Sequence, residues 1–224
     1  MKLNGERLLC KQKGASSNLV ISTMRIVLIA DTHNRTPELP DGDVLIHAGD
    51  ATSNGTREEV ERFDAWLGTL KFRHILFTPG NHDFYLENDR NIIVNATMLI
   101  SEAVIINGLM FWASPYTSRF GGWAFMRSEE RLADIWRHIP DKVDILITHS
   151  PPKGILDYSI SGRNLGSKSL LERSSMIEPK VHVFGHIHEG AGQKRIGATT
   201  YVNASVLNEY YQNVNKPVVI DIGV

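Results

Sequence analysis

The chain alternates between short apolar runs and amphipathic stretches, and this alternation restricts it to a layered α/β fold. Apolar side chains recur at helical spacing in 57–70 and 127–139, where Ser128 is suited to cap the helix. A third helix is expected over 166–174, starting near Ser167. With 224 residues, 42% of them hydrophobic, the chain can bury one sizeable core, so we expect one domain over 25–224. Buried strands are indicated over 25–30, 43–49, 74–80, 143–149, 181–186, 199–205 and 217–223.

Residues 1–24 differ in character from the rest of the chain. They are polar as far as Asn18, and they lack the apolar centre and the small-residue cleavage site of a signal peptide. We expect an N-terminal extension or leader without stable structure, and the alternative is an edge strand over 18–23. No apolar run approaches the roughly 20 residues that span a bilayer, so no membrane partner is expected.

The charge balance disfavours one class of partner, and the cysteine count rules out two kinds of structure. The formal net charge is -1, from 24 basic and 25 acidic residues, so a long nucleic acid is not an expected partner. A small phosphate ester remains compatible with this balance. The single cysteine, Cys10, rules out an internal disulfide framework and a cysteine-based metal site. This usage fits a reducing compartment, and we expect a cytoplasmic protein.

Five of the expected strands end beside side chains that can bind a metal ion. The motifs are D-T-H (31–33), G-D (49–50), G-N-H-D (80–83), T-H (148–149) and G-H-I-H (185–188). A single aspartate after a strand is usually a turn former, and a lone histidine is usually structural. Because sites in α/β sheets gather at the carboxyl ends of strands, five such motifs favour one shared site. The candidate ligands are Asp31, His33, Asp50, Asn81, His149, His186 and His188.

The five motifs, in this order, resemble those of the calcineurin-like metallophosphoesterase superfamily. The stretches HSPPKGILD (149–157), HVFGHIHEG (182–190), TTYVNAS (199–205) and NKPVVIDI (215–222) are similar to the metallophosphoesterase-domain-containing proteins, relatives of class III cyclic-nucleotide phosphodiesterases. This resemblance implies a four-layer αββα sandwich with two mixed β-sheets. It also implies two divalent cations, one held by Asp31, His33, Asp50 and His188, the other by Asp50, Asn81, His149 and His186.

The donor types agree with such a centre. Carboxylate, imidazole and amide groups without a thiolate suit Mn²⁺, Fe²⁺/Fe³⁺ or Zn²⁺. Two such cations support in-line attack on phosphorus by a hydroxide that bridges them. Gly185 is expected to allow a tight turn after its strand, so that His186 and His188 reach different cations.

His82 and Asp83 are the expected catalytic residues outside the ligand set. His82 follows the ligand Asn81 and can give a proton to the leaving oxygen. Asp83 is expected to orient His82 or to raise its pKa, and the alternative for both residues is a supporting contact. Substrate contacts are expected from Asn81, His82 and Arg119, because a guanidinium can pair with a phosphate.

Two segments are candidate rims of the site. Residues 111–128 are expected to form an aromatic loop, whose Trp112, Trp123 and Phe125 either stack on a nucleobase or pack at the edge of the core. Residues 161–170 either hold an anion at a helix N-terminus or form a plain capped loop. His182 and His47 are expected to be structural, with an orienting hydrogen bond to a ligand as the alternative for His47.

The sequence thus favours a metal-dependent phosphodiesterase that acts on a small phosphodiester or nucleotide, such as a cyclic nucleotide. One alternative is a phosphomonoesterase or protein phosphatase with the same metal centre. Another is a nucleotide-binding protein with low turnover. A nuclease is disfavoured because polyanion binding normally uses a basic surface. The identity of the metals and the oligomeric state are open.

Overall fold

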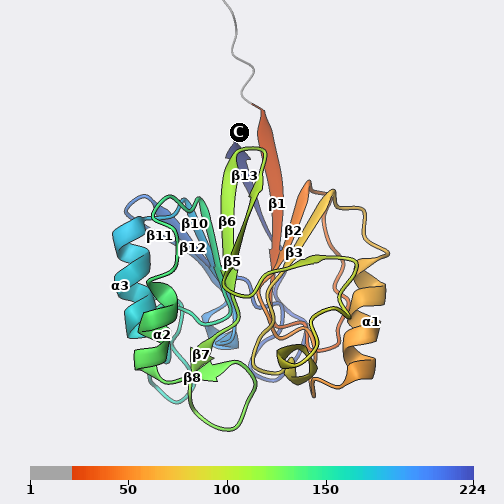
Figure 1. Cartoon of the computed structure of the whole chain (residues 1–224), viewed down its shortest axis with the longest axis horizontal. Coiled ribbons are helices and arrows are strands. Elements are labelled where there is room, and N and C mark those ends of the chain that lie inside the picture. Colours follow the sequence, from red (N-terminus) through yellow and green to blue (C-terminus); the bar gives the residue numbers. More distant parts are fainter. Residues whose placement is uncertain (1–21) are drawn as a thin grey trace, which may run out of the picture.

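The computed structural model describes residues 22–224, and the expectations for residues 1–21 lie outside this range. Two mixed β-sheets pack face to face, with α1 on the outer face of one sheet and α2 and α3 on the outer face of the other (Figure 1). The expected four-layer αββα arrangement is confirmed.

The first sheet has the strand order β13–β1–β2–β3–β4. β1 (Thr23–Ile29), β2 (Val44–His47), β3 (His74–Phe77) and β4 (Thr97–Met98) are parallel, and β13 (Val218–Gly223) runs antiparallel to β1. Thr23 and Met24 pair with Gly223 and Ile222, so β1 begins two residues before the expected strand.

The second sheet has the order β11–β12–β10–β9–β6–β5. Its parallel strands are β6 (Leu109–Ser114), β9 (Ile145–Thr148), β10 (Val181–Phe184) and β12 (Thr199–Asn203). β5 (Glu102–Ile106) and β11 (Gly192–Ile196) pair antiparallel at its edges. A separate pair of strands, β7 (Thr117–Ser118) and β8 (Met126–Arg127), lies within the aromatic segment 111–128. The expectation of a loop over 111–128 is wrong at both ends, because β6 includes residues 111–114 and β8 includes residues 126 and 127.

Each central strand buries apolar side chains on both of its faces. In β1, Ile26 and Leu28 face the core between the sheets, where Phe111 also lies, while Val27 and Ile29 face α1. Apolar contacts on both faces explain why these strands appear in the sequence as continuous apolar runs. On the far side, the second sheet packs against α2 and α3 through a cluster that includes Trp112, Leu132, Trp136, Leu146 and Leu170.

The helices begin at polar caps, as expected for the helix that follows Ser128. The side chain of Thr56 accepts a hydrogen bond at the start of α1 (Arg57–Leu67). Ser128 and Ser167 do the same for α2 (Glu129–Trp136) and α3 (Lys168–Ile177), which confirms the predicted cap at Ser128 and the predicted helix start near Ser167. Short 3₁₀ turns cover Phe84–Glu87 and His188–Gly190. Within residues 22–224, no helix combines the length and the apolar character that crossing a bilayer requires.

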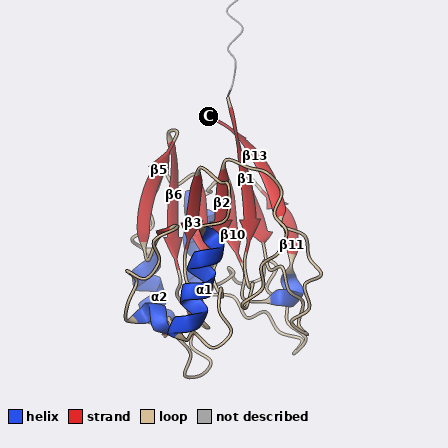
Figure 2. Cartoon of the chain, turned by 90° about the vertical axis from the view of Figure 1, so that its right-hand side faces the viewer, coloured by secondary structure: helices blue, strands red, loops and turns tan. Residues whose placement is uncertain are grey.

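The carboxyl ends of the parallel strands of both sheets lie at one end of the sandwich (Figure 2). The two sheets are joined there by a parallel bridge between Ala30 and Ser205. Ala30 donates its N–H to the carbonyl of Ala204 at 2.8 Å and accepts from the N–H of Val206 at 3.0 Å. The loops that follow β1 and β12 are thereby held side by side.

His182 lies inside β10 and is fully buried, as expected for a structural residue. Its Nε2 is 2.9 Å from the Thr148 hydroxyl, and burial lowers its pKa to about 3. The folded protein therefore keeps His182 neutral, whereas the unfolded chain binds a proton below the ordinary pKa of 6.5. This contribution to stability is present above pH 6.5 and is lost as the pH falls toward 3.

We expect the pH dependence of stability to change when His182 is replaced by glutamine. Between pH 7 and pH 5 the parent should lose about 2 kcal/mol of unfolding free energy through His182 alone, and His182→Gln should not show this loss. Urea unfolding at the two pH values measures the difference. His138→Gln, at an exposed histidine, is the control and should behave as the parent. Equal losses in the parent and in His182→Gln would contradict the prediction.

Candidate metal centre

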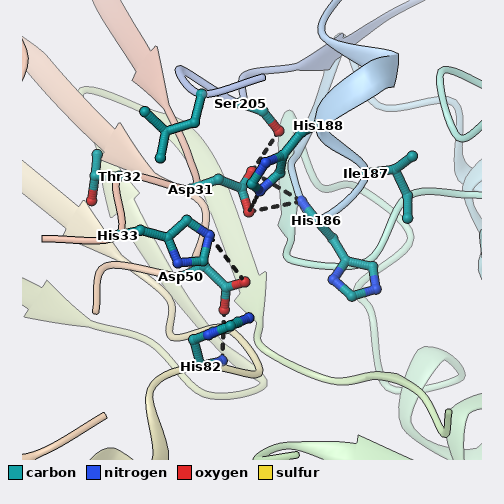
Figure 3. A network of polar contacts seen from close by, with 12 residues as sticks. Asp31, Thr32, His33, Asp50, His82, His186, Ile187, His188 and Ser205 are labelled. Atoms are coloured by element: carbon teal, nitrogen blue, oxygen red, sulfur yellow. Dashed lines mark hydrogen bonds and ion pairs between the residues drawn. The ribbon is translucent and has the colours of Figure 1, made fainter. Parts of the chain in front are cut away.

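The seven candidate ligands meet at the end of the sandwich where the parallel strands terminate. The first sheet contributes Asp31 and His33 after β1, Asp50 after β2 and Asn81 after β3. The second sheet contributes the remaining histidines after β9 and β10, namely His149, His186 and His188. Figure 3 shows the carboxylates of Asp31 and Asp50 among the imidazoles.

The donor atoms form two groups that approach each other at Asp50. Donor atoms of Asp31, His33 and His188 all lie within 4.8 Å of one another, and so do those of Asp50, His149 and His186. The Asp50 carboxylate lies 3.8 Å from His33 Nε2, in the first group, and 3.3 Å from His149 Nε2, in the second. The Asn81 carbonyl oxygen is 3.0 Å from His149 Nε2. Asp50 is therefore placed to contact both positions.

Backbone carbonyls orient three of the four ligand imidazole rings. The Nδ1 atoms of His33, His149 and His188 lie 3.1, 2.9 and 2.9 Å from the carbonyl oxygens of Thr52, Ala48 and Asn208. An Nδ1–H that donates to a carbonyl leaves Nε2 as the atom with the free electron pair. The Nε2 of His33 is buried and has no hydrogen-bond partner within residues 22–224. A cation-binding role satisfies this atom, so the residues fit a bound divalent metal.

The backbone at the ligands is strained. Left-handed φ values occur at four ligands, a region that residues other than glycine seldom adopt. The values are 54°, 41°, 54° and 71° for Asp31, His33, Asp50 and His186. Such strain persists where the surroundings fix it, and it gathers at functional sites. At Asp31, the carboxylate accepts from the His186 N–H at 3.0 Å and from the Ser205 hydroxyl.

Two glycines of the motifs are required by space. A Cβ atom at Gly80 would overlap the Asp50 carboxylate and the Asp50 backbone nitrogen. A Cβ atom at Gly185 would overlap the Asp31 carboxylate. The chain turns tightly after β10, as expected, because the Ile187 N–H donates to the Gly185 carbonyl at 2.8 Å. The left-handed φ of this turn belongs to His186, so Gly185 is required for its close approach to Asp31 rather than for its φ.

The carboxylates and imidazoles shift each other's pKa values. Burial favours the neutral form of Asp31, but the hydrogen bond and charge of His188 outweigh it and hold the pKa of Asp31 below its usual value. His149 likewise lowers the pKa of Asp50. Against burial, the facing carboxylates raise the pKa of His149 and of His188 to about 9. The protein groups alone thus form Asp–His pairs, and a cation would replace the histidine protons.

His82 borders the same space. Its backbone N–H donates to Asp50 at 2.8 Å, and its Nδ1 lies 2.7 Å from the Ser53 carbonyl oxygen. The His33 ring meets it edge-on, with 4.6 Å between centroids. One nitrogen of His82 also lies within 4.8 Å of donor atoms of His33 and Asp50, so metal content is the relevant test of its role.

Asp83 does not orient the His82 ring, which corrects the expectation. Its buried carboxylate accepts from the Gly80 N–H at 2.7 Å and from the N–H and hydroxyl of Thr52 at 2.9 and 2.7 Å. Asp83 therefore ties the loop after β2 to the loop after β3, and the Ser53 carbonyl orients His82 instead. Burial and the nearby charge of Asp50 raise the pKa of Asp83 to about 6.

A pocket of about 210 Å³ opens at this cluster. Arg119 is not part of its lining. The Arg119 N–H donates to the Arg127 carbonyl, and the residue is exposed beside Phe120, so the substrate contact expected of its side chain stays a prediction. Residues 161–170 are also absent from the lining, and Ser167 caps α3. The lining consists of His33, Asp50, Asn81, His82, Phe120, Trp123, His186, His188 and Tyr211.

Two residues of the site escaped the sequence analysis. Ser205 follows β12, and the rule that polar side chains at strand ends mark the site would have found it. Tyr211 packs its ring 4.9 Å from that of His33 and 5.3 Å from that of His188, and its φ is 58°. It lies in a polar loop without periodicity, so no sequence signal identified it.

His47 is buried beside the site. Its Nε2 is 2.9 Å from the hydroxyl of Thr32, which lies between Asp31 and His33, and burial lowers its pKa to about 3. His47 therefore supports the loop that carries two ligands without being a ligand itself.

The fold and this cluster define a four-layer α/β protein with a candidate metal centre, and its similarity to known proteins identifies the family. The family model for calcineurin-like phosphoesterase matches residues 24–190. The chain belongs to the calcineurin-like phosphoesterase family, and it is a metal-dependent phosphoesterase.

Curated relatives agree with this assignment, and a solved structure agrees with the fold. The human metallophosphoesterase domain-containing protein 1 is 40% identical over 88% of this chain and 71% of its own length. A 3',5'-cyclic-nucleotide phosphodiesterase of Nostoc sp. is 24% identical over 70% of this chain and 59% of its own length. The crystal structure of the Thermus thermophilus protein TT1561 superposes with a TM-score of 0.58 at 14% identity, covering 81% of this chain and 89% of that chain. At that identity, the structural likeness shows the fold alone.

Proposed function

We propose that this chain is a dinuclear-metal-dependent phosphodiesterase that hydrolyses a small phosphodiester, such as a cyclic nucleotide. The observation that carries the proposal is the pair of donor groups that approach each other at Asp50, with His82 beside them. Asp31, His33, Asp50 and His188 would hold one cation, and Asp50, Asn81, His149 and His186 the other. Mn²⁺, iron and Zn²⁺ suit this mixture of oxygen and nitrogen donors, and a cytoplasmic setting fits a chain with one cysteine.

When bound, two such cations supply positive charge that stabilises the transition state and lowers the pKa of the attacking water. The protein contributes the leaving-group chemistry. With Nδ1 of His82 directed at Ser53, its Nε2 is the atom left to hold a proton for the leaving oxygen. Asn81 and His82 line the pocket and are placed to contact the phosphate.

The lining of the pocket favours a diester over a monoester. A diester carries an organic substituent on its second ester oxygen, which a monoester lacks. Three of the nine lining residues are aromatic, Phe120, Trp123 and Tyr211. Aromatic walls suit such a substituent. The name of the Nostoc relative supports the same choice.

Hydrolysis of matched model esters tests the proposal. Protein stripped with a chelator and reloaded with Mn²⁺ is offered bis(p-nitrophenyl) phosphate and p-nitrophenyl phosphate. We expect kcat/KM to favour the diester by more than about tenfold, a difference of about 1.4 kcal/mol in transition-state binding. Preference for the monoester would indicate a phosphomonoesterase or protein phosphatase. No cleavage with two metal equivalents bound would indicate a nucleotide-binding protein.

A further inference from the structure

The aromatic residues of the segment 111–128 include a buried pair and an exposed pair. Trp112 and Phe125 are 2% and 3% exposed and belong to the hydrophobic core. Phe120 and Trp123 are 60% and 39% exposed, and both line the metal pocket. Core packing therefore accounts for the first pair and leaves the second pair unexplained.

Trp123 is held in a defined position. Its ring lies 4.4 Å from that of His82 with an angle of 38° between the planes, and 5.8 Å from that of Phe84. The residues that follow it are anchored, because Ala124 donates its N–H to the Asn81 carbonyl at 3.1 Å and Phe125 donates to Glu87 at 2.9 Å. A ring fixed before substrate arrives loses little conformational entropy on binding.

Two further rings border the pocket. The Phe120 ring lies 5.5 Å from that of His186, and the Tyr211 ring lies 4.9 Å from that of His33. Figure 3 shows the His33 ring above the Asp50 carboxylate, His82 below it and the His186 ring to its right. Phe120 and Trp123 therefore adjoin different histidines of the site, while Tyr211 extends the side formed by His33.

We propose that Phe120, Trp123 and Tyr211 form an aromatic subsite that takes a planar group carried by the phosphodiester. The inference rests on the proposed phosphodiesterase function and names its substrate class as diesters with an aromatic substituent. Flat rings stack on any planar π-system, and cations bound at the neighbouring donor groups would hold the phosphate beside these rings. A nucleoside and a simple aryl group share this chemistry, so the test includes both.

Three mixed diesters with the same leaving group isolate the subsite. Ethyl, phenyl and thymidine 5'-yl p-nitrophenyl phosphates all release p-nitrophenolate, which needs little protonation, so the role of His82 affects them alike. We expect the parent to prefer the phenyl and thymidine esters over the ethyl ester in kcat/KM. If only the thymidine ester is preferred over the ethyl ester, the subsite binds a nucleoside. If the phenyl and thymidine esters are preferred equally, the subsite accepts any planar group.

Substitutions at the exposed rings then test the residues. Trp123→Leu and Phe120→Leu should each reduce the ratio of planar to ethyl ester by roughly 5- to 150-fold, the range that stacking on one aromatic ring spans. Tyr158→Leu is the matched control, because Tyr158 is 61% exposed and lies outside the metal pocket. Its ratio should equal that of the parent. Thermal unfolding verifies that each variant folds.

The outcomes separate the two proposals. If the parent cleaves no diester with two metal equivalents bound, the phosphodiesterase function fails. If the parent cleaves all three esters without preference, or if the Trp123 and Phe120 variants lower all three rates by the same factor, the aromatic subsite is overturned while the phosphodiesterase function stands.

Discussion

Replacing His82 by alanine is expected to lower kcat by about 10²–10⁴-fold for an alkyl diester, the usual size of a general-acid effect. The two metal equivalents should remain bound, because His82 is not assigned to either cation. The loss should be smaller for a p-nitrophenyl ester, whose leaving group needs little protonation. Metal analysis and turnover are measured on the same sample.

The control for this substitution is His138→Ala, which removes an exposed imidazole from the end of α2 and should leave kcat unchanged. Loss of a metal equivalent from His82→Ala would show that His82 is a ligand. That outcome is a real alternative, since its ring lies within reach of the donors of His33 and Asp50. An equal rate loss for alkyl and aryl esters would contradict the role in leaving-group protonation.

Asp50→Asn is expected to have the largest effect of any single substitution. The side chain keeps its shape but loses the charge that faces both donor groups. Each cation contributes several kcal/mol to transition-state stabilisation, so impaired binding of both should cost roughly 10⁴-fold or more in kcat. Metal content, measured after dialysis, should fall below two equivalents. The rise in Tm on adding Mn²⁺, expected in the parent, should disappear in the variant.

Asp64→Asn is a matched control for a buried carboxylate. Asp64 accepts hydrogen bonds from the backbone of Val94 and Asn95, which belong to neither donor group, and is 7% exposed. We expect this variant to lose stability but to keep its metal stoichiometry and its Mn²⁺-induced rise in Tm. A full metal complement in Asp50→Asn would contradict the shared position assigned to this carboxylate.

The positions of strands and of polar strand ends could be predicted from sequence because they depend on local pattern. The run from Ile26 to Ala30 is apolar at every position, and the first polar residue, Asp31, marks the end of the strand. That pattern does not distinguish one sheet from two, because Val27 and Leu28 are equally buried against different layers. The two-sheet arrangement therefore came from family resemblance rather than from periodicity.

The unpredicted parts of the site depend on contacts between distant segments. Asp83 is next to His82 in sequence, yet its carboxylate binds the loop of Thr52, and adjacency alone misled the assignment. Arg119 is close in sequence to Phe120 but does not line the pocket. Tyr211 reaches it from a loop that lacks any pattern. Side-chain direction in loops is fixed by tertiary packing, which local sequence does not encode.

The division of the candidate ligands between the two sheets has a consequence for the lifetime of the folded state. Asp31 and Asp50 belong to one sheet and His149 and His188 to the other, so the cluster is complete only after the sheets have packed. Cations held across this junction would stabilise the native state without stabilising a transition state in which the sheets are still apart. Metal should then slow unfolding much more than it accelerates folding. In this protein, metal supply would set resistance to proteolysis through the unfolding rate as well as setting catalytic competence.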